Sequence, residues 1–357
     1  MSAKERFFDS VHGFIHLSEE EKQLLEHPAF IRLHYLHQLG IAYLVYPGAT
    51  HSRFEHSLGV MHVASKIYDQ IFETQNQIHR QALRLGALCH DLGHLPFSHT
   101  LEHELLSDHG HEKKTIEVLY LLKDTPIFKR YENLHPGFFN LVVKIAVSPS
   151  IYLKYFKNDS YLGDEKLLSS IVSGDYFGAD RIDYLIRDSR FTGVSVGLFD
   201  YPQLIEMLTV CTINDQEMMA LKEEGLEAVE GLLLARHYMH ARVYCHRGVL
   251  ACNQALKAFV KKISIPDFIS LAAEDYIKYT DAWLIQQFIE ASFDTKHPAH
   301  KEALVLMSRL QKSEKKQAIA SKKMPGPLYL VKKTGQVETL YPKAWDASLF
   351  VNEPPIV

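Results

Sequence analysis

Cysteine is scarce in this 357-residue chain, with four residues in all. They are Cys89, Cys211, Cys245 and Cys252. None forms a Cys-x-x-Cys pair, so a cysteine-based zinc or redox site is not indicated. A chain of this length can bury a large core without disulfides. We therefore expect free, buried thiols in the reducing environment of the cytoplasm.

Long hydrophobic runs are also missing. No apolar segment approaches the roughly 20 residues that span a bilayer. The N-terminal stretch MSAKERFFDSVHGFIHL lacks the apolar core of a signal peptide. The sequence therefore predicts no membrane partner.

A strong charge of one sign is absent as well. The formal net charge is −4, from 39 basic and 43 acidic residues. Proteins that bind nucleic acid mainly through its phosphates are usually basic. The charge balance gives no support to nucleic acid as a partner, although a local basic patch would remain compatible with one.

Histidine, in contrast, is abundant, with 21 residues in the chain. It is the commonest metal ligand in proteins and the side chain that titrates near neutral pH. The hydrophobic fraction of 46% and the charged fraction of 23% are ordinary for a globular protein. The histidine content is therefore the reason to search this sequence for a metal or acid–base site.

Apolar residues recur with helical spacing along most of the chain. Helices are predicted at about 19–26, 28–36, 54–73, 80–91, 112–122, 137–148, 165–173, 179–190, 226–259, 273–292 and 299–313. Alternating patterns predict two β-hairpins, 208–213 with 218–222 and 328–332 with 337–341. The basic run 312–323 and the Met-Pro-Gly-Pro stretch after it predict an exposed connection. The predicted fold class is mainly α with minor β.

A candidate metal site comprises His56, His90, Asp91 and Asp180, which lie on three separate predicted helices. Because His90 and Asp91 end an apolar helix, two neighbours can ligate one ion there. Two imidazoles and two carboxylates form a mixed nitrogen and oxygen set that suits a first-row divalent ion or magnesium. The alternative is a histidine-rich helical core without metal, which would bury several imidazoles at a desolvation cost.

The order of these residues resembles the H…HD…D pattern of the HD-domain superfamily. Longer blocks resemble the deoxynucleoside triphosphate triphosphohydrolases over roughly residues 5–260. These blocks are Gln38–Gly40, Tyr46–Ala49, His51–Val60, Cys89–His99, His111-Glu112, Asp180–Asp188 and Arg236–Arg247. The resemblance implies an HD-type helical catalytic domain at residues 1–265. A C-terminal helical region with a small α/β lobe would follow at residues 266–357.

The resemblance also implies a reaction in which water attacks the α-phosphorus of a deoxynucleoside triphosphate, the bond from that phosphorus to the 5′ oxygen breaks, and the whole triphosphate is released from the deoxynucleoside. The implied cofactor is a divalent ion (Mn, Fe, Zn, Ni or Mg) on the four residues of the candidate metal site. The implied catalytic residues are Arg53, His94, His99, Glu102 and His111. The implied substrate contacts at the phosphates are Arg53, Arg181 and Arg236, and those at the sugar are Gln38, Leu39, Tyr184, Asp188 and Tyr244. His240 is a further implied substrate contact. Which histidine is the general acid stays open.

Several of these residues have an ordinary explanation when taken singly. Tyr184 and Tyr244 could be packing tyrosines, and Arg181 with Asp188 could be a solvated pair. His99 could equally be a helix cap or a core residue.

The sequence also departs from the family: Arg181 stands where lysine is usual, Cys245 replaces a glutamine, and Glu102 replaces a shorter acid. Because Phe8 and His34 replace polar or basic nucleotide-reading residues, nucleotide activation is not carried over.

The predicted function is hydrolysis of deoxynucleoside triphosphates to deoxynucleoside and inorganic triphosphate by a homo-oligomer, a dimer or tetramer. One alternative is another HD phosphohydrolase activity, on nucleoside monophosphates, cyclic nucleotides or an alarmone. The other alternative is a weakly catalytic module that senses nucleotides or binds nucleic acid.

Overall fold

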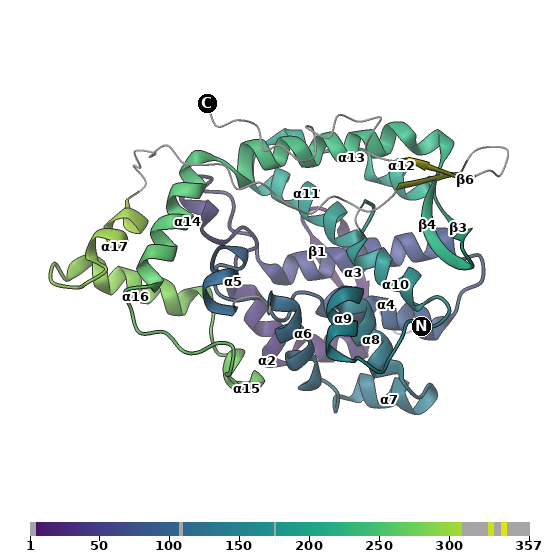
Figure 1. The fold of residues 1–357 in the computed structure, drawn as a ribbon, viewed down its shortest axis with the longest axis horizontal. Coiled ribbons are helices and arrows are strands. Elements are labelled where there is room, and N and C mark those ends of the chain that lie inside the picture. The colour runs from purple at the N-terminus through teal and green to yellow at the C-terminus, as the bar shows by residue number, and fades with distance from the viewer. Residues whose placement is uncertain (1–4, 107–109, 175, 309–327, 332–336, 341–357) are drawn as a thin grey trace.

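The structure is a computed structural model that describes residues 5–106, 110–174, 176–308, 328–331 and 337–340. Helices account for most of the described residues (Figure 1). They are α1 (Glu19–Leu25), α2 (Pro28–Ile31), α3 (Arg53–Ile71), α4 (Gln77–Cys89), α5 (His99–Leu106), α6 (Gly110–Tyr120), α7 (Pro126–Leu134), α8 (Phe138–Ala146), α9 (Pro149–Tyr155), α10 (Glu165–Ser173), α11 (Ala179–Thr192), α12 (Tyr201–Glu206), α13 (Leu226–Met239), α14 (Arg247–Val260), α15 (Ala273–Tyr276), α16 (Asp281–Phe293) and α17 (His300–Met307). The mainly α prediction is therefore confirmed.

Helix α3 is the centre of the helical core, where it packs against α4 and α11. It starts at a capping box: Ser52 accepts from the backbone of Glu55, and the Glu55 carboxylate accepts from the backbone of Ser52. Asn76 caps α4 in a similar way. The almost wholly apolar helix α8 covers the other side of α4. Helix α3 is thus buried on most sides and holds its side chains in fixed positions.

The strands form two small sheets. In the first, β1 (Glu5–Asp9) pairs antiparallel with β2 (Gly13–Leu17), a hairpin that the sequence patterns did not predict. The second has the order β3-β4-β5-β6 and contains both predicted hairpins. They are formed by β3 (Leu208–Ile213) with β4 (Gln216–Lys222), and by β5 (Leu328–Val331) with β6 (Val337–Leu340). Asn214 and Asp215 have φ of 50° and 59°, as a tight two-residue hairpin turn requires.

Helix boundaries differ from the prediction in places that matter for function. Helix α4 ends at Cys89, so His90 is the C-cap and Asp91 lies beyond the helix. The segment predicted as one helix at 226–259 contains α13, a π-helical turn at His240–Tyr244, and α14. Short π-helical segments often occur at functional sites. The short helices α5, α7, α9 and α12 were not predicted; three of them have proline in their first turn, a start signal that was present in the sequence.

Residues on either side of the predicted domain boundary at 265/266 contact one another. Strand β5 pairs in parallel with β4, and α17 packs against α14 (Figure 1, left). The two-domain division remains a prediction. The basic run 312–323 and the turn pair Thr334-Gly335 lie outside the described residues. Within the described ranges, no helix is long and apolar enough to cross a membrane.

Candidate metal centre and its surroundings

The four predicted metal ligands converge at the meeting point of α3, the end of α4 and the start of α11. Ligand atoms of His56, His90 and Asp91 all lie within 4.8 Å of one another. Asp180 Oδ1 is 3.0 Å from His56 Nε2 and 3.7 Å from His90 Nε2. His56, at 1% exposed, and Asp91, at 4%, are almost completely buried. The prediction that these residues share one location therefore agrees with the geometry.

Hydrogen bonds fix how both imidazoles face this point. His56 Nδ1 is 2.8 Å from Asp183 Oδ2, and His90 Nδ1 is 2.7 Å from the Ala87 carbonyl oxygen. Because a carboxylate and a carbonyl only accept, each Nδ1 carries a proton, and each Nε2 is the nitrogen that can present a lone pair to a bound cation. His90 Nε2 is buried and has no hydrogen-bond partner among the described residues. The donor set therefore fits a divalent cation bound through the two Nε2 atoms and the carboxylates.

The carboxylates at the candidate metal centre favour a bound cation. Burial by itself lowers the pKa of His56, but the carboxylates of Asp180 and Asp183 overcome it and raise the pKa to about 10. Burial by itself raises the pKa of Asp180, yet the hydrogen bonds to His56 and His90 hold it well below its usual value. The carboxylates thus stay ionised and favour positive charge between them.

Arg53 is attached to the same group through Asp91. Its Nη1 donates to Asp91 Oδ2, and its Nε donates to Ser98 Oγ at 2.7 Å. Ser98 and the preceding Phe97 have φ of 49° and 56°, a left-handed conformation that is costly outside glycine. Asp281 accepts from the Phe97 backbone N–H at 2.7 Å and stabilises this turn from α16. A strained turn thus places Ser98 against the guanidinium group.

The predicted catalytic histidines form a second group beside the first. The rings of His94 and His111 stack at 3.8 Å between centroids, and His94 Nε2 lies 3.2 Å from Asp91 Oδ1. Glu102 accepts from Nδ1 of both His111, at 2.7 Å, and the exposed His99, at 2.9 Å. The three histidines lie close enough together to hold an ion. However, the in-plane lone pairs of two stacked rings do not converge on one point, so we treat this group as an acid–base and hydrogen-bonding site.

Burial, together with the nearby Arg53 and His111, holds the pKa of His94 well below its usual value. Burial by itself raises the pKa of Glu102, but the hydrogen bonds from His111 and His99 hold it far below the ordinary value. His94 is therefore neutral near pH 7, and Glu102 is an ionised acceptor. Glu102 thus fixes Nδ1 of both His99 and His111, so each ring turns its Nε2 away from this carboxylate.

Three predicted substrate contacts, Arg181, Arg236 and His240, form a cationic cluster on α11, α13 and the π-helical turn. Arg181 Nε and Arg236 Nε are buried, and neither has a hydrogen-bond partner in the part of the chain that the structure describes. Burial, with Arg236 and Arg181 as the neighbouring charges, lowers the pKa of His240 to about 4. Unpaired guanidinium groups beside a neutral imidazole are a suitable environment for a polyanion.

The predicted sugar contacts occupy the next part of α11. Asp188 is 2% exposed, and both of its oxygens accept hydrogen bonds, from His51 Nε2 at 2.7 Å and the Tyr244 hydroxyl at 2.8 Å. The rings of Tyr184 and Tyr244 meet edge to face at 6.3 Å. Neither tyrosine is therefore a random surface residue, and Arg181 with Asp188 is not a solvated ion pair.

The segment that carries Gln38 and Leu39 is hydrogen-bonded to His51, the partner of Asp188. The Gln38 backbone N–H donates to the His51 carbonyl at 3.0 Å. Gln38 Oε1 is buried without a hydrogen-bond partner among the residues described here. Leu39 is half-buried against the hydrophobic core. The segment thus carries an unsatisfied polar group and is linked to Asp188 through His51.

Comparisons with known proteins agree with this geometry. Residues 53–147 match the model of the family described as HD domain, and residues 199–303 match that of the HD associated region. The chain belongs to the HD-domain family. The HD domain match contains His56, His90 and Asp91, whereas Asp180 lies between the two matches.

Several relatives of this HD protein match most of the chain. An uncharacterized protein of Methanocaldococcus jannaschii is 33% identical over 78% of this chain and 56% of its own length. Deoxynucleoside triphosphate triphosphohydrolase SAMHD1 of Homo sapiens is 29% identical over 77% of this chain and 45% of its own length. The chain thus spans about half the length of the curated relatives it matches. A crystal structure of a hypothetical protein from Aquifex aeolicus matches with a TM-score of 0.74 and 29% identity, over 98% of this chain and 94% of that one.

Some functional residues of this HD protein were missed by the sequence patterns. Asp183 hydrogen-bonds His56, and His51 hydrogen-bonds Asp188, although both lie inside the blocks quoted above. Asp183 follows Asp180 by three residues, so its place on the same helical face was an available signal. For His12 and Ser98, no local pattern indicates the partner.

Gly59 allows α3 and α11 to approach at the HD metal centre, which gives a testable prediction. A Cβ atom at Gly59 would overlap Asp183 Oδ1 and crowd Arg187 Nη2. We expect Gly59→Ala to lower the free energy of unfolding by about 1–3 kcal/mol, because overpacking forces buried groups apart. Thermal unfolding of the metal-free protein measures this loss.

Gly231→Ala is the matched control, because a Cβ at Gly231 would meet only Phe199 Cβ at 3.7 Å. In the middle of α13 this change should stabilise the protein by about 0.5–1 kcal/mol. Equal stability of the Gly59→Ala and Gly231→Ala proteins would show that the contact of α3 with α11 is loose.

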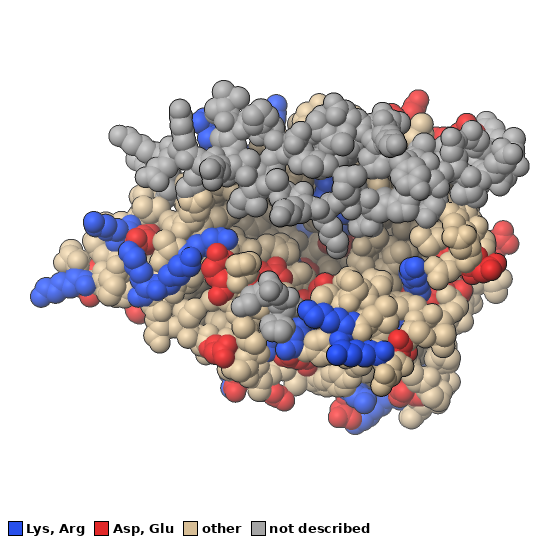
Figure 2. Space-filling view, in the orientation of Figure 1, with Lys and Arg blue, Asp and Glu red and all other residues tan. Residues whose placement is uncertain are grey.

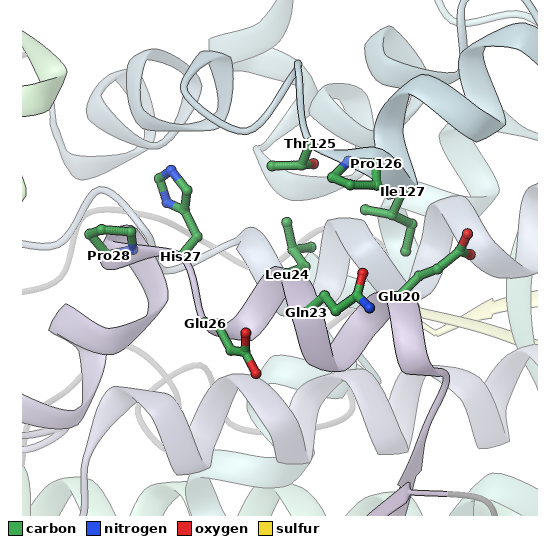
Figure 3. Close-up of a pocket in the computed structure, with 9 residues that line it drawn as sticks. All are labelled: Glu20, Gln23, Leu24, Glu26, His27, Pro28, Thr125, Pro126 and Ile127. Atoms are coloured by element: carbon green, nitrogen blue, oxygen red, sulfur yellow. The ribbon is translucent and has the colours of Figure 1, made fainter.

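A surface pocket of about 300 Å³ lies elsewhere in the HD protein, between α1 and α7 (Figure 3). Its lining includes Glu20, Leu24 and His27 from one side, and Thr125 and Ile127 from the other. None of its lining residues belongs to the predicted site. The close-up shows apolar Leu24 and Ile127 between the acidic side chains.

Proposed function

We propose that this protein hydrolyses deoxynucleoside triphosphates at the α-phosphate ester, giving a deoxynucleoside and inorganic triphosphate. The observation that carries the proposal is the order of groups along α11. Asp180 lies at the metal centre, Arg181 follows in the cationic cluster, and Tyr184 and Asp188 lie one and two turns further on. One helix thus aligns a metal ligand, a phosphate contact and sugar contacts. Relatives named deoxynucleoside triphosphate triphosphohydrolase support the same substrate.

The proposed cofactor is a divalent ion held by His56, His90, Asp91 and Asp180. When bound, it supplies Lewis acidity that polarises a phosphoryl oxygen and activates water. Arg53 adds a buried positive charge beside Asp91. Its strained support at Ser98 keeps the guanidinium group preorganised, so little reorganisation is needed as charge develops.

The histidine group provides proton transfer and hydrogen bonds at the reacting phosphate. Neutral His94 can donate to a phosphoryl oxygen, and the Glu102-bound histidines His99 and His111 can hold or deliver a proton. The cluster of Arg181, Arg236 and His240 would bind the triphosphate, while the 5′ oxygen of the deoxynucleoside leaves and takes up a proton. The two guanidinium groups carry positive charge and the neutral imidazole offers a hydrogen bond, which together suit the several negative charges of the triphosphate.

The sugar would lie against the wall formed by Leu39 and Tyr244. Because the Tyr244 hydroxyl already donates to Asp188, the ring has a fixed position. An apolar and aromatic wall leaves a 2′-hydroxyl without a hydrogen-bond partner. An unsatisfied buried hydroxyl costs about 1–3 kcal/mol, which corresponds to a preference for deoxyribose of roughly 5- to 150-fold.

We propose in addition that the protein is cytoplasmic and forms a homo-oligomer, a dimer or tetramer. Exposed aromatic side chains on the β1–β2 hairpin support self-association, with Phe8 74% and Phe14 48% exposed. Light scattering during size-exclusion chromatography measures the assembly.

On the face that Figure 2 shows, basic and acidic described groups lie interspersed among uncharged ones, which offers no support for nucleic acid as a partner.

Product analysis tests the proposed reaction. The purified protein, loaded in turn with Mn, Fe, Zn, Ni and Mg, is incubated with each deoxy- and ribonucleoside triphosphate in ¹⁸O-labelled water. We expect deoxynucleoside and triphosphate, with the label in the triphosphate and deoxyribonucleotides preferred. Monophosphate plus pyrophosphate as first products would refute α-ester cleavage. Turnover only of monophosphates, cyclic nucleotides or an alarmone would favour another HD phosphohydrolase activity. Salt-sensitive binding without turnover would favour a sensing or nucleic-acid-binding module.

A further inference from the structure

The turn between β1 and β2 reaches the metal centre through a closed set of buried hydrogen bonds. His12, in this turn, places Nε2 2.6 Å from Asp183 Oδ1, and both side chains are fully buried. Asp183 in turn lies 2.8 Å from Nδ1 of His56, a proposed metal ligand. The turn is therefore one residue removed from the ligand, although it lies outside both family-model matches.

Arg187 completes the set around Asp183. Its Nε and Nη2 donate to Asp183 at 2.8 Å and 3.0 Å, and its Nη1 donates to Asp9 Oδ2 at 2.8 Å. Asp9 Oδ1 accepts from the backbone N–H groups of Val11 and His12, each at 2.8 Å. The hydrogen bonds thus return to the turn from which they began.

Asp183 receives four donors in this arrangement, two on each carboxylate oxygen. A carboxylate has about four acceptor positions. With all of them occupied, Asp183 is held in one orientation and meets His56 only as an acceptor. A proton of His56 is thereby held on Nδ1, which leaves Nε2, on the side of Asp91 and Asp180, as the nitrogen that can bind a cation.

We propose that His12 is a positioning residue for the metal centre: by holding Asp183, it fixes the tautomer and the ring orientation of His56. Loss of such an outer partner typically costs about 10- to 100-fold in metal affinity. The inference rests on the proposed metal centre but not on the proposed substrate. The N-terminal hairpin, which the family match omits, would thus be an essential part of the site.

Metal binding without nucleotide tests this role. Metal-free protein is titrated with Mn²⁺ and with Zn²⁺ in competition with a chelator, for the wild type, His12→Leu, His12→Gln and His12→Asn. We expect His12→Leu to bind about 10- to 100-fold more weakly. His12→Gln places an amide N–H near the position of Nε2 and should stay within a few-fold of the wild type. His12→Asn is too short to reach Asp183 and should lose affinity.

His62→Leu is the matched control. The His62 ring lies 5.3 Å from that of His12, and its Nε2 has no hydrogen-bond partner among the described residues. The His62→Leu substitution removes an imidazole from the same region without changing a contact of Asp183. We therefore expect this variant to bind the metal with wild-type affinity. If His12→Leu fails to fold, the comparison of Gln with Asn at position 12 gives the same answer.

Three results would overturn the inference: wild-type metal affinity of a folded His12→Leu protein, equal losses in His12→Leu and His62→Leu, or a wild-type protein that binds no divalent ion. An inactive wild type that binds metal in a His12-dependent manner would instead refute only the proposed substrate. Unfolding temperatures of the metal-free variants separate positioning from stability, because a purely structural role would lower them without changing the affinity of the folded protein.

Discussion

The Asp91→Ala protein should retain no divalent ion and should show no measurable turnover. Asp91 lies between the two groups of the site: Oδ1 is 3.2 Å from both His90 Nε2 and His94 Nε2, and Oδ2 accepts from Arg53. Its removal deletes a carboxylate ligand and leaves the buried Arg53 charge unpaired. Elemental analysis of the purified protein and product formation with a deoxynucleoside triphosphate measure the two losses.

Asp91→Asn separates ligand loss from a general loss of structure. Asparagine keeps the size of Asp91 and can still accept from Arg53, but it has no negative charge for the ion. We expect Asp91→Asn to fold and still lose the metal. Asp69→Ala is the control, because Asp69 pairs with Arg80 on the exposed side of α3 and should keep both metal and activity. Full activity in a metal-free Asp91→Asn protein would refute the metal centre.

Arg236→Ala should weaken substrate use while leaving the metal in place. Arg236 Nε is buried without a hydrogen-bond partner in the described part of the chain, and its charge contributes to the low pKa of His240. A hydrogen bond to a charged group contributes about 1.5–3 kcal/mol, so kcat/KM should fall by roughly 10- to 150-fold. Steady-state kinetics with metal analysis on the same samples gives both values.

Arg242→Ala is the control for this prediction, because Arg242 is an exposed arginine on the π-helical turn that follows α13, the helix of Arg236. It should leave kcat/KM unchanged. Inorganic triphosphate should also inhibit the wild type more strongly than Arg236→Ala, since the product is proposed to bind there. Equal kcat/KM in the Arg236→Ala and wild-type proteins would place the distal phosphates elsewhere.

Local sequence patterns were sufficient for the helices that carry the ligands. The predicted helices at 54–73 and 179–190 correspond to α3 and α11, because each has an apolar face at helical spacing, and α3 also begins at a capping box. The ordered residues His56, His90, Asp91 and Asp180 then identified one family and one location. The β3–β4 hairpin was also predictable, since its alternation and its turn pair are local features.

Only the tertiary structure decided what surrounds the ligands. His56 is separated from Asp183 by 127 residues in sequence, and His12 from Asp183 by 171. Periodicity describes a residue's own helix or strand, so it cannot show which side chains meet across such distances. The left-handed Phe97 and Ser98 are held by Asp281 of α16, a contact that no pattern near residue 97 reveals.

The chain's sequence by itself thus determined the chemistry that is present: two imidazoles and two carboxylates in family order, and arginines to follow them. For His90, the Ala87 carbonyl of its own helix fixes which nitrogen faces the candidate metal centre. For His56, the packing of α3 against α11 and against the β1–β2 hairpin decided this, because its partner Asp183 comes from a distant segment whose geometry exists only once the core has formed.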